Sequence, residues 1–313
     1  MVEDNQIKAQ VSPFAIREGE IKVFDGQDGY VSMNQIVHKI NIGHITDIHF
    51  EILNLVNEFE FITSRQLFQM LKIKGIDVKS QDKLNNKLET MVKSKILTRY
   101  YFSSDEGKGI YRIYCLEKMG KYLLSTREIE CNWQQSDNTK PVAMIKKRLA
   151  GNQILIAYLR KVGAFDEFTV KYPIKAKSLG KTFKPSGGCV KLTKNNKSIQ
   201  FVFEVVRREE KWEEKLIEKM KFYKDFYDNF IINDSGFKSI PQLIILAEDE
   251  RNMAEIFKVI VTNNIEIEKI NLLYTTDLRQ NSDSLEDTLT EFKLDPETNK
   301  YKAHNVNLKL LGM

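Results

Sequence analysis

The chain has 313 residues, which is room for two domains of ordinary size, and its hydrophobic share of 42% is that of a folded protein. No apolar run is long enough to cross a membrane, and the polar, acidic first residues lack the apolar core of a signal peptide. The three cysteines are odd in number and widely spaced, which argues against a disulfide framework and against a metal-binding spacing. We therefore expect a cytoplasmic protein without membrane contact and without a cofactor.

The formal net charge of +5 is distributed unevenly along the chain. Residues 62–125 carry thirteen Lys or Arg against six Asp or Glu, and residues 140–200 carry fourteen against two. Residues 201–313 are acidic, with 22 Asp or Glu against sixteen Lys or Arg. Positive fields attract phosphate backbones whatever their sequence, so the two basic segments indicate nucleic acid as a partner. Solvated surface lysines are the alternative explanation.

The first 40 residues form an N-terminal extension whose role the sequence does not reveal. Residues 21–24 and 30–33 are strand-like and flank a segment with Gly26 and Gly29. Two apolar runs around a glycine-bearing turn predict a short hairpin.

Residues 41–125 have the element order of a winged helix-turn-helix. We expect helices over residues 46–56, 65–71 and 81–93, with Ser64 and Ser80 as N-caps of the second and third. Two strands follow, over residues 97–102 and 110–116, joined by a polar tip at 103–109, and a short helix closes the unit at 117–124. In this arrangement one helix enters the major groove while the hairpin touches phosphates.

The third helix carries the predicted DNA-reading surface. Its apolar residues Leu84, Leu88, Met91 and Val92 share one face. Asparagine can bind adenine with two hydrogen bonds, and lysine can reach guanine or phosphate. The candidate contacts are therefore the polar residues of the helix and one residue of the hairpin tip: Gln81, Lys83, Asn86, Lys87, Thr90, Lys93 and Lys108. Two alternatives stay open, an ordinary solvated helix face and a winged helix that binds protein.

A polar linker is expected at residues 126–140, followed by an α/β domain over residues 141–313. The predicted helices cover residues 144–162, 209–230 and 253–262. The predicted strands cover 168–172, 189–193, 199–207, 242–247 and 270–275, with a polar connection at 277–291. Residues 175–184 are expected to form a basic loop, in which Lys175, Lys177 and Lys181 would contact phosphates.

This second domain resembles the restriction-endonuclease-like fold. In that fold a Pro-Asp dipeptide and a Glu-x-Lys triplet on the next strand hold a divalent metal and orient water, and a helix follows. The matching segments here are Pro185-Ser186, the strand end at residues 204–207, and the helix with Lys219 and Tyr223. Together with the winged helix, they make the chain similar to the replication-relaxation family of plasmid and conjugative-element proteins. The resemblance covers roughly residues 46–275 and implies a DNA-linked role on a mobile element.

The departures from the nuclease pattern predict an inactive site. Ser186 stands where an acidic metal ligand is expected, Val206 stands where Lys or Asp is expected, and Glu204 alone cannot fix a metal. We expect Glu204 to pair with Arg207 or with a lysine of the crossing helix. Mg²⁺ would be needed only if Asp166, Glu167, Lys191 or Lys215 rebuilt the site.

The fold expected from the sequence is thus an α+β winged helix-turn-helix followed by an α/β restriction-endonuclease-like domain. The expected function is that of a non-catalytic accessory protein in plasmid or conjugative-element replication or transfer. Its expected partners are double-stranded DNA and a replication or transfer protein, and a homodimer is compatible with the sequence. A winged-helix transcription regulator with a dimerisation or ligand domain is one alternative, and a metal-dependent nuclease with Glu204 as its remaining catalytic candidate is the other.

Overall fold

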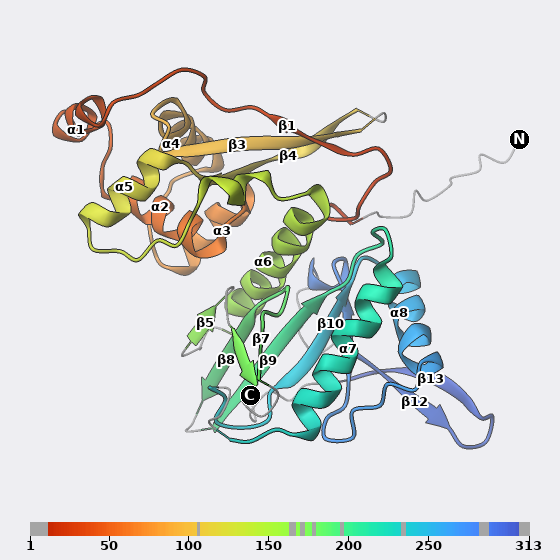
Figure 1. Cartoon of the computed structure of the whole chain (residues 1–313). Helices are drawn as coiled ribbons and strands as arrows, with labels where there is room; N and C mark the ends of the chain where they lie inside the picture. The colour runs from red at the N-terminus through yellow and green to blue at the C-terminus, as the bar shows by residue number, and fades with distance from the viewer. Residues whose placement is uncertain are drawn as a thin grey trace, which may run out of the picture.

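The computed structural model describes residues 12–306 apart from 105–106, 163–166, 170–172, 177–179, 195–196, 233–235 and 282–287. The architecture is mixed α+β, with an N-terminal part built on one sheet and a C-terminal part built on another (Figure 1). The long helix α6 (Val142–Val162) runs from the first part into the second. Over the described residues, none of the helices has both the length and the apolar character needed to cross a bilayer.

The N-terminal part contains three helices followed by a hairpin, in the order expected. The helices are α2 (Asp47–Phe59), α3 (Ser64–Ile73) and α4 (Gln81–Lys93), with the short strand β2 (Ile62–Thr63) before α3. The hairpin is β3 (Leu97–Ser104) with β4 (Gly107–Leu116), and α5 (Lys118–Thr126) closes the unit. The strand order is β1-β3-β4-β2, in which β1 covers Ile21–Phe24.

Capping explains where α3 and α4 begin. The Ser80 side chain accepts a hydrogen bond from the Lys83 amide at 3.3 Å, as expected for an N-cap. Ser64, however, is not the cap of α3. The Thr63 hydroxyl accepts from the Gln66 amide at 3.2 Å, and the Gln66 side chain accepts from the Thr63 amide at 3.1 Å. This capping box makes Thr63 the N-cap, one position before the predicted Ser64, so Ser64 is the first residue of the helix.

The prediction of a hairpin within the first 40 residues is wrong. Strand β1 (Ile21–Phe24) instead pairs antiparallel with β3, where Ile21 lies opposite Ser103. Residues 30–33 form no strand, because Ser32 caps the helix α1 (Met33–Asn41) through a capping box with Gln35. The polar segment at 126–140 includes a 3₁₀ turn (Gln135–Thr139), in which buried Asn138 donates to the Leu116 carbonyl at 2.9 Å.

Buried amide side chains attach α6 to the N-terminal part. Gln66 donates to the Leu149 carbonyl at 2.7 Å, and Asn152 donates to the Phe61 carbonyl at the same distance. Both side chains are at most 1% exposed. One apolar cluster runs without a break from α2–α4 through α6 to the second sheet. Buried hydrogen bonds within such a cluster fix one relative position of the two parts.

The C-terminal sheet has the strand order β13-β12-β11-β10-β9-β8-β5 over the described residues. Its centre is parallel: β9 (Lys197–Val205), β10 (Gln242–Ala247) and β11 (Leu273–Thr276). The flanking strands are antiparallel: β5 (Glu167–Thr169), β8 (Cys189–Lys194), β12 (Thr290–Asp295) and β13 (Lys300–Asn305). Along β9, Phe201 and Phe203 pack toward α6, whereas Val202 packs toward α7 (Trp212–Asp228), which itself contacts α8 (Glu250–Thr262).

Several expected boundaries in this part are corrected. The basic loop expected at 175–184 contains parts of two strands, because β6 (Ile174–Ala176) pairs antiparallel with β7 (Lys181–Phe183). Residues 177–179 between them lie outside the described residues. Helix α7 begins three residues later than expected and α8 begins three residues earlier. Strand β5 covers Glu167–Thr169, while residues 170–172 of the expected strand lie outside the described residues. The strand expected at 270–275 begins at Leu273. The connection expected to last until residue 291 ends where β12 begins, at Thr290.

Candidate nucleic-acid interface and nuclease-like site

The outer face of α4 is open. Lys83, Asn86 and Lys93 are exposed, whereas Leu84, Leu88, Met91 and Val92 are buried against the rest of the N-terminal part. Lys93 forms an i,i+4 ion pair with Glu89 at 3.6 Å, and its side chain stays 63% exposed. An exposed pair of this kind breaks at little cost, so Lys93 is available to a phosphate group.

The other candidate residues of α4 lie at the flanks of this face. Gln81 donates to the Ser64 carbonyl and to Asn85, each at 3.2 Å, so it faces α3. The Thr90 hydroxyl donates to the Asn86 carbonyl at 3.1 Å. Lys87 lies on the opposite flank, near His49 of α2. There burial, and then the Lys87 charge, lower the pKa of the imidazole to about 4. The structure therefore brings Lys83, Asn86 and Lys93 together and sets Gln81 and Lys87 to either side.

The remaining basic candidates are scattered. Lys108 lies on β4 beside the hairpin tip, but its side chain falls outside the described residues, as does all of Lys177. Lys175 and Lys181 are exposed on β6 and β7, where they lie at register positions next to one another rather than in the expected basic loop. They belong to the C-terminal part, away from α4 (Figure 1).

The nuclease-like motif segments meet at the Glu204 carboxylate. Its Oε1 accepts from the Ser186 hydroxyl at 2.6 Å and from the Lys219 ammonium. Its Oε2 accepts from the Tyr223 hydroxyl at 3.0 Å and from the Ser186 amide at 3.3 Å. Glu204 is 1% exposed. The expected pairing with a lysine of the crossing helix is confirmed, and the helix spacing of Lys219 and Tyr223 explains why both reach the same group.

These contacts leave no place for a catalytic metal ion. Both carboxylate oxygens already accept two hydrogen bonds each, and one donor is a cation. Among the described residues, no three His, Cys, Asp or Glu side chains gather as a metal site would require. The Ser186 hydroxyl that replaces the expected carboxylate donates to Glu204 and accepts from the Val205 amide at 2.8 Å. A divalent cation needs several free oxygen ligands, so the residues present do not fit one.

Arg207, Lys215 and Lys147 near this site form ion pairs with carboxylates other than Glu204. Arg207 does not pair with Glu204. It is fully buried and donates twice to Asp277, at 2.8 and 2.9 Å. The Lys215 ammonium pairs with Glu209, as does that of Lys147.

Next to Glu204 lies a cavity of about 680 Å³, which Lys181 also lines. Lys191 lies opposite Glu167 on β8 and β5, and Asp166 falls outside the described residues.

A second polar surface, which was not predicted from the sequence, lies beside α4. On the hairpin, Arg99 lies opposite Tyr114, and Tyr101 lies opposite Arg112. Asp25 accepts from both arginines at 2.9 Å, and Glu89 of α4 also pairs with Arg99. The available signal was the period-two alternation of Arg and Tyr on each strand, which places all four on one face.

No protein-family model and no curated protein matches the chain. Among solved structures it is similar to one titled "Structure of restriction endonuclease FokI", with a TM-score of 0.28 and 11% sequence identity. The match covers 74% of this chain and 42% of that chain, so it spans less than half of the endonuclease.

Proposed function

We propose that the protein binds double-stranded DNA through α4 and the β3–β4 hairpin and does not cleave it. The N-terminal part would act as a winged helix-turn-helix and the C-terminal part as an inactive restriction-endonuclease-like domain. The observation that carries the proposal is the open outer face of α4, where Lys83, Asn86 and Lys93 are exposed together. Asn86 offers an amide to a base edge, while the two lysines offer charge to phosphates.

The proposed absence of cleavage rests on the Glu204 site. Hydrolysis of a phosphodiester in this class of site needs a metal that activates water and neutralises the developing charge. Here the Lys219 ammonium contacts the Glu204 carboxylate near the end of β9, and Ser186 supplies a hydroxyl in place of an acid. What remains is a closed hydrogen-bonded group that stabilises the C-terminal part.

We further propose that the protein is an accessory factor in replication or transfer of a plasmid or conjugative element. Support comes from the convergence of Ser186, Lys219 and Tyr223 on Glu204, because the resemblance to the replication-relaxation family rests on these same positions. The partner in that role would be a replication or transfer protein acting at the bound DNA.

The test combines selection of a binding site with a cleavage assay. Duplexes recovered from a random library should yield a preferred site, and Asn86→Ala should relax the preference and cost roughly 1–3 kcal/mol of binding free energy at that site. Lys83→Ala should weaken all duplexes alike and lower the salt slope by about 0.9. Lys258→Ala on the exposed side of α8 is the matched control for charge.

Supercoiled plasmid incubated with Mg²⁺ should stay intact with both the wild type and Glu204→Gln. Nicking by the wild type that Glu204→Gln abolishes would establish a nuclease instead. Unselective duplex binding that neither Asn86→Ala nor Lys83→Ala changes would show that α4 is not the DNA-binding surface.

A further inference from the structure

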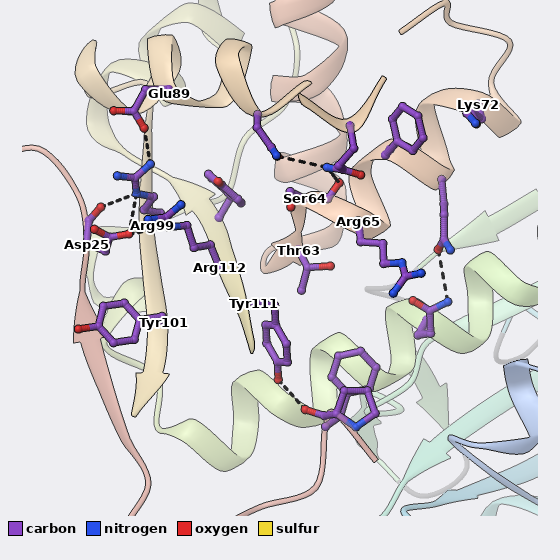
Figure 2. Close-up of a pocket in the computed structure, with 18 of the residues that line it drawn as sticks. Asp25, Thr63, Ser64, Arg65, Lys72, Glu89, Arg99, Tyr101, Tyr111 and Arg112 are labelled. Carbon is purple, nitrogen blue, oxygen red and sulfur yellow. Dashed lines mark hydrogen bonds and ion pairs between the residues drawn. The ribbon is translucent and has the colours of Figure 1, made fainter. Parts of the chain in front are cut away.

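A large groove lies on the flank of α4, between α3, the β3–β4 hairpin and α6. Its volume is about 1920 Å³, and both β1 and residues 12–14, here called the N-terminal arm, contribute to its lining. Figure 2 shows α3 with Arg65 on one side and the hairpin with Arg99 and Arg112 on the other. The walls are held in place by buried contacts, among them the Gln66 hydrogen bond that joins α3 to α6. The groove is therefore a preformed feature.

The charged groups of the groove that form no ion pair with another described residue are positive. Arg65 of α3 and Arg160 of α6 are exposed and form no ion pair with another described residue. The carboxylates that line the groove are neutralised in place. Asp25 and Glu89 contact Arg99, and Asp277 is held by buried Arg207. An approaching ligand thus meets arginines without competing acids, which favours an anion.

Aromatic rings line the same space. Phe68 of α3 and Tyr101 of β3 are partly exposed, and Phe24 of β1 is 48% exposed. The Lys72 ammonium lies 4.4 Å from the centre of the Phe68 ring. Rings beside cations are the combination that binds unpaired bases and their phosphates, since every base has a face that can stack.

Amide side chains complete the lining. Gln153 of α6 donates to Gln69 of α3 at 3.4 Å, and Gln81 donates to Asn85 at 3.2 Å. Each amide offers both donors and an acceptor, so it can bind the edge of a base. Arginine, amide and aromatic groups together fit nucleic acid better than an acidic peptide, which would need the cations but not the rings.

We propose that this groove binds single-stranded nucleic acid, with bases on Phe68 and Tyr101 and phosphates on Arg65, Lys72 and Arg160. The inference deepens the proposed function, because Asn86 lines the groove and also belongs to the outer face of α4. A duplex on the outer face would then continue into the groove as one separated strand. Lys83 and Lys93 lie outside the groove lining, which makes the two surfaces separable by mutation.

The experiment measures fluorescence anisotropy with labelled oligo(dT) of about 15 nucleotides and with a duplex of the same length. The groove variants are Arg65→Gln with Arg160→Gln, and Phe68→Leu, which removes the ring but keeps an apolar side chain. The outer-face variant is Lys83→Gln with Lys93→Gln. Lys74→Gln with Lys258→Gln removes the same charge at exposed positions outside the groove. Thermal melting identifies any variant that fails to fold.

Each groove variant should weaken oligo(dT) binding by roughly tenfold and leave duplex binding unchanged, while the outer-face variant should do the reverse. The proposal is overturned if oligo(dT) is not bound, or if the control pair weakens it as much as the groove pair does. It is also overturned if polyglutamate displaces oligo(dT) and Phe68→Leu has no effect, since the groove would then bind any polyanion. Groove-dependent oligo(dT) binding without duplex binding would refute the proposed duplex function alone.

Discussion

The Lys219 ammonium contacts the buried carboxylate of Glu204, and this contact holds α7 against β9. The Ser186 and Tyr223 hydroxyls donate to the same carboxylate. These contacts join β9, α7 and the segment before β8 at one buried group.

We expect Glu204→Gln to lower the free energy of unfolding by roughly 1–3 kcal/mol, because a charge-assisted hydrogen bond is lost in a site that is otherwise fully bonded. Lys219 is 31% exposed and can turn toward water, which limits the loss. Urea unfolding at neutral pH measures the change. Glu218→Gln, on the exposed side of the same helix, is the control and should change little. An equally stable Glu204→Gln protein would contradict the structural role.

A second prediction concerns pH. Burial, followed by the charge of Lys87, lowers the pKa of His49 to about 4, while the unfolded chain keeps the ordinary value near 6.5. The unfolded state therefore binds more protons between these values, so this contribution to stability is present above pH 6.5 and is lost as the pH falls. The His49 Nδ1 accepts from the Thr46 amide at 3.0 Å, which protonation of Nδ1 would prevent.

The loss between pH 7.5 and pH 5 should be about 2 kcal/mol more in the wild type than in His49→Gln, whose amide can still accept at this helix start. Urea unfolding of both proteins at the two pH values gives the difference directly, and contributions from carboxylates cancel. Parallel pH dependence in the two proteins would show that His49 does not titrate as proposed.

A third prediction concerns Gly151 of α6. A Cβ at this position would lie 2.6 Å from the Gly187 Cα and 3.2 Å from the Ser186 carbonyl oxygen. Gly151→Ala should therefore destabilise the protein by roughly 1–3 kcal/mol through overpacking, even after the gain of about 1 kcal/mol in helix propensity. Thermal melting measures the effect. Ala254→Gly, on the exposed side of α8, measures propensity alone, and a Gly151→Ala protein more stable than the wild type would refute the close approach.

The fourth prediction concerns the buried pair Arg207 and Asp277. Asp277→Ala leaves a fully buried guanidinium without its carboxylate and should cost roughly 3–5 kcal/mol. Glu250→Ala removes the partner of Arg279 at the surface, where the Glu250 side chain is 56% exposed, and should cost about 0–1 kcal/mol. Chemical denaturation compares the two. Similar losses would mean that Arg207 finds another partner.

Local patterns were enough to predict the elements that matter most for the candidate interface. The spacing of Leu84, Leu88 and Met91 gave α4 its buried face, and Ser80 marked its first turn. The apolar run before Glu204 likewise gave β9. These signals depend only on neighbours in the sequence, because helix and strand periods decide which side chains share a face.

Features that depend on distant residues could not be predicted in the same way. Strand β1 needed β3 as a partner about eighty residues later, so its own turn residues suggested a hairpin that does not form. In the short strand β6, Ile174 and Ala176 are buried and Lys175 between them is exposed. The many lysines of this segment favoured a basic loop over a strand in the sequence-based prediction. The groove is assembled from α3, the hairpin and α6, and nothing within any one of these segments indicates the other two.

The N-terminal arm is hydrogen-bonded to a residue much later in the sequence. The Ser12 hydroxyl donates to Asp277, 265 residues away, and the Tyr111 hydroxyl donates to the Pro13 carbonyl at 2.9 Å. At a synthesis rate of about 5–20 residues per second, the ribosome takes roughly 10–50 seconds to travel from one partner to the other. The contact between Ser12 and Asp277 can therefore form only after the chain has been made past the end of β11.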